Sequence, residues 1–344
     1  MAVSTPWYER DTRFIPAHYQ PATLIDLALS RDIDSHRLLR GTGLFVEDIL
    51  AGQTRLSPQQ FLGLIGNARR LLAADDSSFL FGQRLLPGHY GAASQALRHA
   101  QNLHQALDTL VNRHALLSPL ARPQLTLDEQ FAYVHWHDSC GADEHWQFVM
   151  EASMSALVAM SQWLSGERLP WECSFGFAEP RYVEQYWVHL GDNSQFNQPQ
   201  QQMRIPREFL ARPWPTASPI AGQVAQQEAA VQAAQAGFES SLLDGLHDYL
   251  WANASQAPGL EQVAEAFAMS PATLKRKLQK HATGFQQQND QVRKHLALHL
   301  YRIKGWSTDQ VADYLKFNDQ ANFRRSFKRW TGSTPGLIRQ LLQL

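Results

Sequence analysis

Two segments near the C-terminus carry side chains that can recognise DNA, at matching positions. Residues 261–281 and 309–330 align at an offset of 48, which becomes 49 after one extra residue, and the alignment pairs Arg276 with Arg325. Arginine can bind guanine through two hydrogen bonds, and glutamine or asparagine can bind adenine in the same way. Lysines and the remaining arginines suit phosphates, which fix the register on DNA without reading its sequence. These residue types predict a DNA-recognition surface.

The candidate contacts lie on the outward side of the second half of each segment. For any one of them the alternative is a solvated charged surface. For Arg276 and Arg325 we favour contact with bases over a solvated surface, because the two residues are equivalent in the two copies. The candidates in the first segment are Lys275, Arg276, Lys277 and Lys280, and those in the second are Gln320, Asn322, Arg324, Arg325 and Lys328.

The charge distribution supports a basic C-terminal part. All seven lysines lie between Lys275 and Lys328. Residues 241–344 hold seven lysines and seven arginines against eight acidic residues, a net charge of +6, whereas residues 1–240 have a net charge of −7. The whole-chain net charge of −1 hides this division. A basic end on a neutral protein indicates binding to phosphate.

Each basic segment needs a scaffold, and the pattern indicates a helix-turn-helix. In the first copy, a helix at 260–267 precedes a turn, and Ser270 and Pro271 open a second helix, 271–281. In this motif the second helix enters the major groove. Apolar residues at helical spacing predict the buried sides: Val263, Ala264, Phe267, Leu274 and Leu278.

The second copy repeats this arrangement after a long helix, 285–303, that we expect to hold the two units at a fixed spacing. Ser307 with Gln310 forms a capping-box pattern for its first helix. We expect Asn318 to cap the recognition helix and Gly332 to end it. The inward residues are Val311, Ala312, Leu315, Phe323, Phe327 and Trp330.

The remainder of the chain predicts a mixed α+β domain. Helical patterns cover 22–40, 58–73, 92–112 and 145–164, residues 123–138 alternate like a β-hairpin, and 170–210 suggest strands, including one at 182–190. Helix 145–164 is either core or a dimer seam. We predict a first domain at 1–215, a linker at 216–237 that can be helical, and an all-α domain at 238–344.

Other chemistry is weakly indicated in the first domain. His135, His137, Cys140 and His145 could suggest a metal site, but the alternative is half-buried histidines on an aromatic-rich strand and a helix start, and spacing this loose is common by chance. We therefore predict no metal, no cofactor and no catalytic residues. Two cysteines, no signal peptide and no apolar run near 20 residues favour a reduced, cytoplasmic protein without a membrane segment.

At this point residues 238–344 resemble the AraC/XylS family of bacterial transcription regulators. The matching residues are 311–317, 323–332, 333–335 and Arg339, and one departure is Lys316, where the family usually has glycine. Lys316 is therefore expected to adopt a positive φ or to alter the turn. Carried over by position, the family's base-contacting residues near the start of each recognition helix add Ala272 and Ala321, which can contact a thymine methyl.

The first domain shows a weaker resemblance to a subgroup that includes ornithine-utilisation and virulence regulators, carried by 82–91 and 97–120. That resemblance implies an arabinose-binding-like domain for effector binding and dimerisation, without naming the effector. The expected partners are double-stranded DNA, a small-molecule effector, a second copy in a homodimer, and RNA polymerase.

Three classes of function follow. The first is a sequence-specific regulator that responds to an effector. The second is a regulator controlled by a protein partner or by concentration. The third is a DNA-repair enzyme fused to this module. Because two cysteines cannot supply four zinc ligands and a nucleophile, the residues disfavour the third and predict a protein that is not an enzyme.

Overall fold

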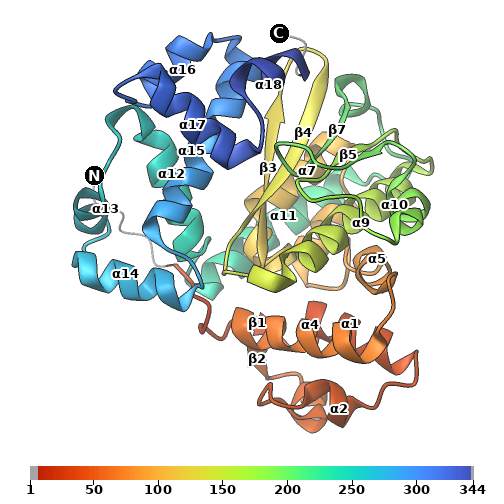
Figure 1. Ribbon diagram of the computed structural model, residues 1–344. Helices are drawn as coiled ribbons and strands as arrows, with labels where there is room; N and C mark the ends of the chain where they lie inside the picture. The colour runs from red at the N-terminus through yellow and green to blue at the C-terminus, as the bar shows by residue number, and fades with distance from the viewer. Residues whose placement is uncertain (1–6, 342–344) are drawn as a thin grey trace.

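The strands of the chain gather in its N-terminal part, and its C-terminal part contains helices alone (Figure 1). The computed structural model describes residues 7–341. Buried apolar side chains form one large cluster in the first part and two smaller clusters in the second. The predicted α+β domain followed by an all-α domain is confirmed.

The first domain is organised on a sheet with the strand order β3-β4-β7-β5-β6. The predicted hairpin forms its long antiparallel pair, and Asp128 stabilises the turn by accepting hydrogen bonds from the backbone amides of Gln130 and Phe131. A separate small pair, β1 (Ile15–Pro16) and β2 (Arg55–Leu56), lies beside the first helices. The sheet strands are β3 (Ala121–Leu127), β4 (Phe131–Asp138), β5 (Glu172–Ser174), β6 (Ser194–Gln195) and β7 (Gln202–Pro206).

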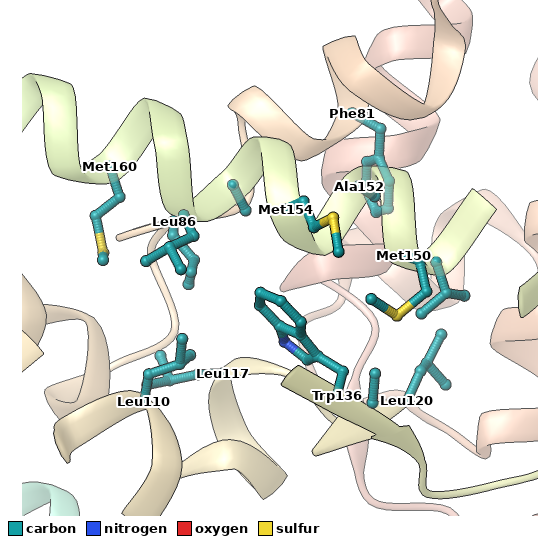
Figure 2. Packing of buried hydrophobic residues seen from close by; sticks show 14 of the residues in the cluster. Phe81, Leu86, Leu110, Leu117, Leu120, Trp136, Met150, Ala152, Met154 and Met160 are labelled. Carbon is teal, nitrogen blue, oxygen red and sulfur yellow. The ribbon is translucent and has the colours of Figure 1, made fainter. Parts of the chain in front are cut away.

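Helix α9 (Trp146–Ser165) supplies much of this core. Its methionines Met150 and Met154 are fully buried and point from α9 toward Trp136 of β4 (Figure 2). Helix α5 (Ser77–Gln83) approaches α9 closely at Gly82, where a Cβ atom would lie 2.4 Å from the carbonyl oxygen of Ala152. Helix α9 is therefore a core helix rather than an exposed seam.

Three of the predicted elements differ in the structure. The expected helix 22–40 is interrupted, because Asp32 has φ 59° and Asp34 caps a second helix. The expected helix 92–112 is likewise divided, and Asn102 caps its second part. The expected strand 182–190 is a helix, whose Tyr186 and Leu190 are buried four residues apart. These helices are α1 (Gln20–Leu29), α2 (Ser35–Leu39), α6 (Ala92–Arg98), α7 (Leu103–Asn112) and α10 (Val183–Leu190).

Other local predictions are confirmed. Ser57 caps the helix that begins at Pro58, and a capping box with Gln60 completes the start. The remaining helices of the domain are α3 (Val46–Leu50), α4 (Pro58–Leu72) and α8 (His114–Leu117), with 3₁₀ turns at Asp143–His145 and Arg207–Phe209.

The segment expected to link the domains is a helix, α11 (Pro219–Ala236), packed on α6. Gln232 accepts a hydrogen bond from the amide of Ala92 at 3.1 Å, and Gln226 donates one to Thr109. The linker helix is thus attached to the first domain. The boundaries at 215 and 238 stay predictions.

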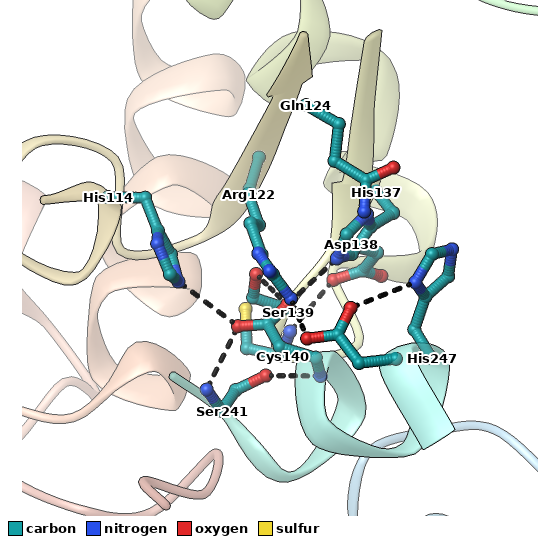
Figure 3. A network of polar contacts seen from close by, with 12 residues as sticks. His114, Arg122, Gln124, His137, Asp138, Ser139, Cys140, Ser241 and His247 are labelled. Carbon is teal, nitrogen blue, oxygen red and sulfur yellow. Dashed lines mark hydrogen bonds and ion pairs between the residues drawn. The ribbon is translucent and has the colours of Figure 1, made fainter. Parts of the chain in front are cut away.

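The two domains contact each other through buried polar groups (Figure 3). Asp244, in the first helix of the second domain, is fully buried and accepts hydrogen bonds from Ser139 at 2.8 Å and from His137 at 3.1 Å. Burial alone would raise the pKa of Asp244, but the hydrogen bonds of His114 and His137 hold it well below the usual value. At Gly141 the domains meet so closely that a Cβ atom would lie 1.9 Å from the carbonyl oxygen of His281.

Candidate DNA-binding surface

The second domain contains the two predicted helix-turn-helix units, joined by a long helix that runs between them (Figure 1). Each unit has its own core: α15 contributes Val292 to the first and residues from Leu296 to Tyr301 to the second. A shared rigid helix thus fixes the units relative to each other. The helices are α12 (Leu242–Ala252), α13 (Leu260–Ala266), α14 (Pro271–Lys280), α15 (Phe285–Lys304), α16 (Thr308–Tyr314), α17 (Gln320–Thr331) and α18 (Pro335–Leu341).

The recognition helices begin at capped positions. Ser270 accepts a hydrogen bond from the amide of Thr273 at 3.1 Å, as its N-cap position predicts. In the second unit the cap is Asp319 rather than Asn318: Asp319 has extended φ and ψ and accepts a hydrogen bond from the amide of Asn322 at 2.7 Å. The prediction of Asn318 was wrong by one residue, because either side chain type can cap and only the backbone conformation selects between them.

The turn inside each unit has the same backbone geometry. Ala268 has φ 53° and Lys316 has φ 56°, at equivalent positions. The next residues, Met269 and Phe317, donate backbone hydrogen bonds to the equivalent Ala264 and Ala312 at 2.9 Å and 3.0 Å. The predicted positive φ of Lys316 is confirmed, and the turn keeps its shape without glycine.

The structure places the candidate contacts on the outer faces of α14 and α17. Phe323 and Phe327 point into the core and leave the intervening polar residues outside. Lys277 and Asn322 are half-buried. The exposed candidates are Ala272, Lys275, Arg276, Lys280, Gln320, Ala321, Arg324, Arg325 and Lys328.

The polar side chains of α17 orient one another. Asn322 accepts a hydrogen bond from Arg325 at 2.6 Å and donates one to the capping Asp319. Gln320 accepts from Arg324 at 3.4 Å. Within residues 7–341, the side chains of Lys275 and Arg276 on α14 make no comparable hydrogen bonds. The second recognition helix therefore presents a more ordered polar surface.

Two acidic residues near the start of the chain pair with candidate DNA contacts on α14. Lys277 pairs with Glu9, and Lys280 lies 2.7 Å from both Glu9 and Asp11. Burial alone would raise the pKa of Glu9, but hydrogen bonds from the two lysines lower it below the usual range. The sequence did not predict this contact. Its only signal was the acidic pair Glu9 and Asp11 near the start of the chain, far in sequence from every lysine.

The same segment is anchored to the second domain by its backbone. Tyr8 and Ser241 form a parallel bridge, and the amide of Leu242 donates to the carbonyl of Tyr8 at 3.0 Å. Trp7 packs against Phe267 of the first unit, with ring centroids 5.4 Å apart. The acidic residues are therefore held beside α14 rather than meeting it by chance.

The four residues considered for a metal have separate roles. His135 bonds Gln124 at 2.8 Å, His137 bonds the buried Asp244, and Cys140 contacts a backbone carbonyl. His145 lies instead against Arg69, at 3.1 Å. Within residues 7–341, no group of three histidine, cysteine or acidic side chains is arranged to hold a metal ion. Among the helices of the same residues, none combines the length and the apolar composition of a membrane span.

Comparison with known proteins finds a family match in each part of the chain. Residues 263–340 match a helix-turn-helix domain family. The chain is similar to an ornithine utilization regulator of Pseudomonas aeruginosa, with 28% identity over 95% of this chain and 96% of that protein. It is also similar to the HTH-type transcriptional regulator VqsM of the same organism, with 32% identity over 23% of this chain and 24% of that protein.

Among solved structures, the transcriptional regulator CdpR from Pseudomonas aeruginosa aligns with a TM-score of 0.40 and 20% identity, over 93% of this chain and 98% of that chain. The matched families and relatives are transcription regulators rather than enzymes. Residues 33–214 match the family described as the arabinose-binding domain of AraC transcription regulator, N-term. The chain therefore belongs to the family of AraC transcription regulators, with an arabinose-binding-like first domain and a DNA-binding helix-turn-helix region.

Proposed function

We propose that this protein is a sequence-specific transcription regulator that places α14 and α17 in successive major grooves on one face of the DNA. The observation that carries the proposal is the duplication: Arg276 and Arg325 lie exposed at equivalent positions on two capped helices. Successive major grooves on one face are about 34 Å apart. The shared helix α15 supplies the rigidity that such a spacing needs.

In this arrangement the two helices contribute unequally. Helix α17 offers Gln320, Asn322 and Arg325, types that recognise base edges, whereas α14 offers mainly lysines, which suit phosphates. Recognition of the operator therefore depends more on α17. The predicted contacts Ala272 and Ala321 are exposed near the helix starts, where a methyl group can meet a thymine methyl.

The test replaces Arg325 with alanine. We expect Arg325→Ala to weaken operator binding by about 1–3 kcal/mol and to relax specificity at one base position, with a much smaller effect on random DNA. Binding to both DNAs is measured by fluorescence anisotropy at a fixed salt concentration. Arg207→Ala, in the first domain, is the control for the loss of one positive charge. An equal loss on operator and random DNA would show that Arg325 contacts only phosphate.

The first domain is proposed to bind a small-molecule effector and to form a homodimer in the cytoplasm, with RNA polymerase as a further partner at the promoter. The match of 33–214 to an arabinose-binding domain family supports a ligand-binding role, and the relative named for ornithine utilization favours a metabolite as the signal. Binding would shift the balance between DNA-competent and incompetent arrangements. A ligand that raises the melting temperature and changes operator affinity supports this role, whereas control by a protein partner or by concentration predicts no such ligand.

A further inference from the structure

A buried carboxylate lies in the first domain, in a place that DNA binding does not explain. Glu151 of α9 is 3% exposed. Its Oε1 accepts hydrogen bonds from Gln147 at 3.0 Å, from Tyr182 at 3.0 Å and from Tyr186 at 2.5 Å. Its Oε2 accepts one hydrogen bond, from Ser78 at 2.5 Å. Helices α5, α9 and the start of α10 thus converge on a single acidic group.

All four of these donors are neutral. Among residues 7–341, no lysine, arginine or histidine forms an ion pair with Glu151. Burial and the negative charge of Glu151 both raise the pKa of Tyr182 and Tyr186, so the two phenols stay protonated as donors. A buried charge without an opposite charge is costly, and proteins usually pair it. The described part of the chain therefore retains an anion whose counter-charge it does not supply.

A pocket opens beside this carboxylate. It has a volume of about 310 Å³ and is lined by residues of α4, α5, α9 and the segment before α10. Glu151 and Gln147 form part of its wall, and Arg69, Arg181 and Asp75 line the same space. The side chain of Arg181 is 85% exposed and pairs with Asp75 at 3.3 Å, which places both residues where the pocket meets solvent. The pocket thus combines a buried carboxylate with two arginines and a second, exposed carboxylate, Asp75.

We propose that this pocket binds a small diamino acid, with its side-chain ammonium on Glu151 and its carboxylate on Arg69 or Arg181. The Oε2 atom of Glu151 accepts one hydrogen bond, which leaves an acceptor position unfilled, since a carboxylate offers about four in all. A ligand ammonium there would supply the missing positive charge. This inference rests on the proposed function, because it names the site and the chemical class of the effector.

The volume and the lining limit the ligand. The pocket is at the small end of the range of about 300–1,000 Å³ that is typical of ligand sites, and its polar wall does not favour a long apolar chain. A compact zwitterion with a second amine fits both the carboxylates and the arginines. Ornithine and its decarboxylated form, putrescine, are therefore suitable probes, together with norvaline, which lacks the side-chain amine.

Isothermal titration of the full chain tests the proposal. We expect L-ornithine to bind, and Glu151→Gln to weaken that binding at least tenfold. L-norvaline should bind at least tenfold more weakly than L-ornithine, because it lacks the side-chain ammonium. Arg181→Gln should weaken L-ornithine more than putrescine, which has no carboxylate. Glu184→Gln, an exposed change of the same kind on α10, is the matched control and should leave binding unchanged.

A stability measurement separates a ligand site from a purely structural carboxylate. In Glu151→Gln the amide oxygen can still accept hydrogen bonds, and the buried charge is removed, so without ligand we expect the melting temperature to be unchanged or higher. A structural carboxylate predicts a lower melting temperature. Absence of ornithine and putrescine binding at millimolar concentration, or equal binding by Glu151→Gln, would overturn the proposal.

The two proposals fail in distinguishable ways. Titration of the ligand does not involve DNA, and the Arg325→Ala comparison does not involve ligand. Specific operator binding without amine binding refutes the pocket and leaves the regulator. Amine binding without sequence-specific DNA binding refutes the regulator and leaves the pocket.

Discussion

Neutralising Glu9 and Asp11 should strengthen DNA binding. These residues engage Lys277 and Lys280 on α14, and both lysines are candidate phosphate contacts. In the double variant Glu9→Gln, Asp11→Asn the lysines no longer have competing carboxylates. The prediction is therefore a gain of affinity on all DNA sequences, since phosphate contacts do not discriminate between bases.

The size of the effect follows from the exposure of these pairs. The side chain of Glu9 is 13% exposed, but those of Lys280 and Asp11 are 36% and 57% exposed, so solvent screens the outer pair. Exposed ion pairs contribute about 0.2–1 kcal/mol each. Releasing the three pairs should therefore lower the free energy of DNA binding by about 0.6–3 kcal/mol, or about 3- to 160-fold in affinity.

Salt dependence gives an independent readout. Each additional phosphate contact steepens the slope of log affinity against log salt by about 0.9, so the double variant should show a slope steeper by up to about 1.8. Fluorescence anisotropy at several salt concentrations measures both quantities. Glu47→Gln, Asp48→Asn changes the net charge equally on the exposed helix α3 and is the control. Unchanged affinity and slope would show that Lys277 and Lys280 do not contact DNA.

Two further predictions concern stability. A side chain in the left-handed region costs about 1–2 kcal/mol, and the greater flexibility of glycine stabilises the unfolded chain by about half of that. Lys316→Gly and Ala268→Gly should therefore each raise the free energy of unfolding in urea by about 0.5–1 kcal/mol. A decrease in both variants would mean that the turn is not strained. Burial lowers the pKa of His135 to about 3 and of His137 to about 4, with neighbouring histidines adding to the effect. The unfolded chain takes up these protons below about pH 6.5, and the folded chain takes them up only near pH 3 to 4. The free energy of unfolding should therefore decrease as the pH is lowered through this window, by up to about 1.4 kcal/mol per pH unit for each histidine. A flat profile there would contradict the burial of these neutral rings.

Local chemistry explains why much of the fold could be predicted. Ser57, Ser270 and Ser307 cap helices because their side chains reach amides only three residues ahead. The failures have the opposite origin. Residues 182–190 are rich in aromatic and β-branched types, which favour strands in isolation, but packing on α9 selects a helix.

The candidate DNA contacts could be predicted from the sequence, because the repeat aligns two helices and the helical period separates their inner faces from their outer faces. The partners of Lys277 and Lys280 could not be predicted in this way, since Glu9 and Asp11 lie nearly 270 positions earlier in the chain. The same holds for Asp244, whose histidine partners belong to the other domain.

The sequence by itself determined the duplicated helix-turn-helix, its turns, the caps Ser270 and Ser307, and the class of molecule that it recognises, because each depends on residues within a few positions of one another. Only the tertiary structure decided which charges meet: the acidic segment beside α14, the histidines on Asp244, and the carboxylate of Glu151, which no cation within residues 7–341 pairs. Such pairings depend on where distant segments come together in three dimensions. Spacing along the chain carries no record of that.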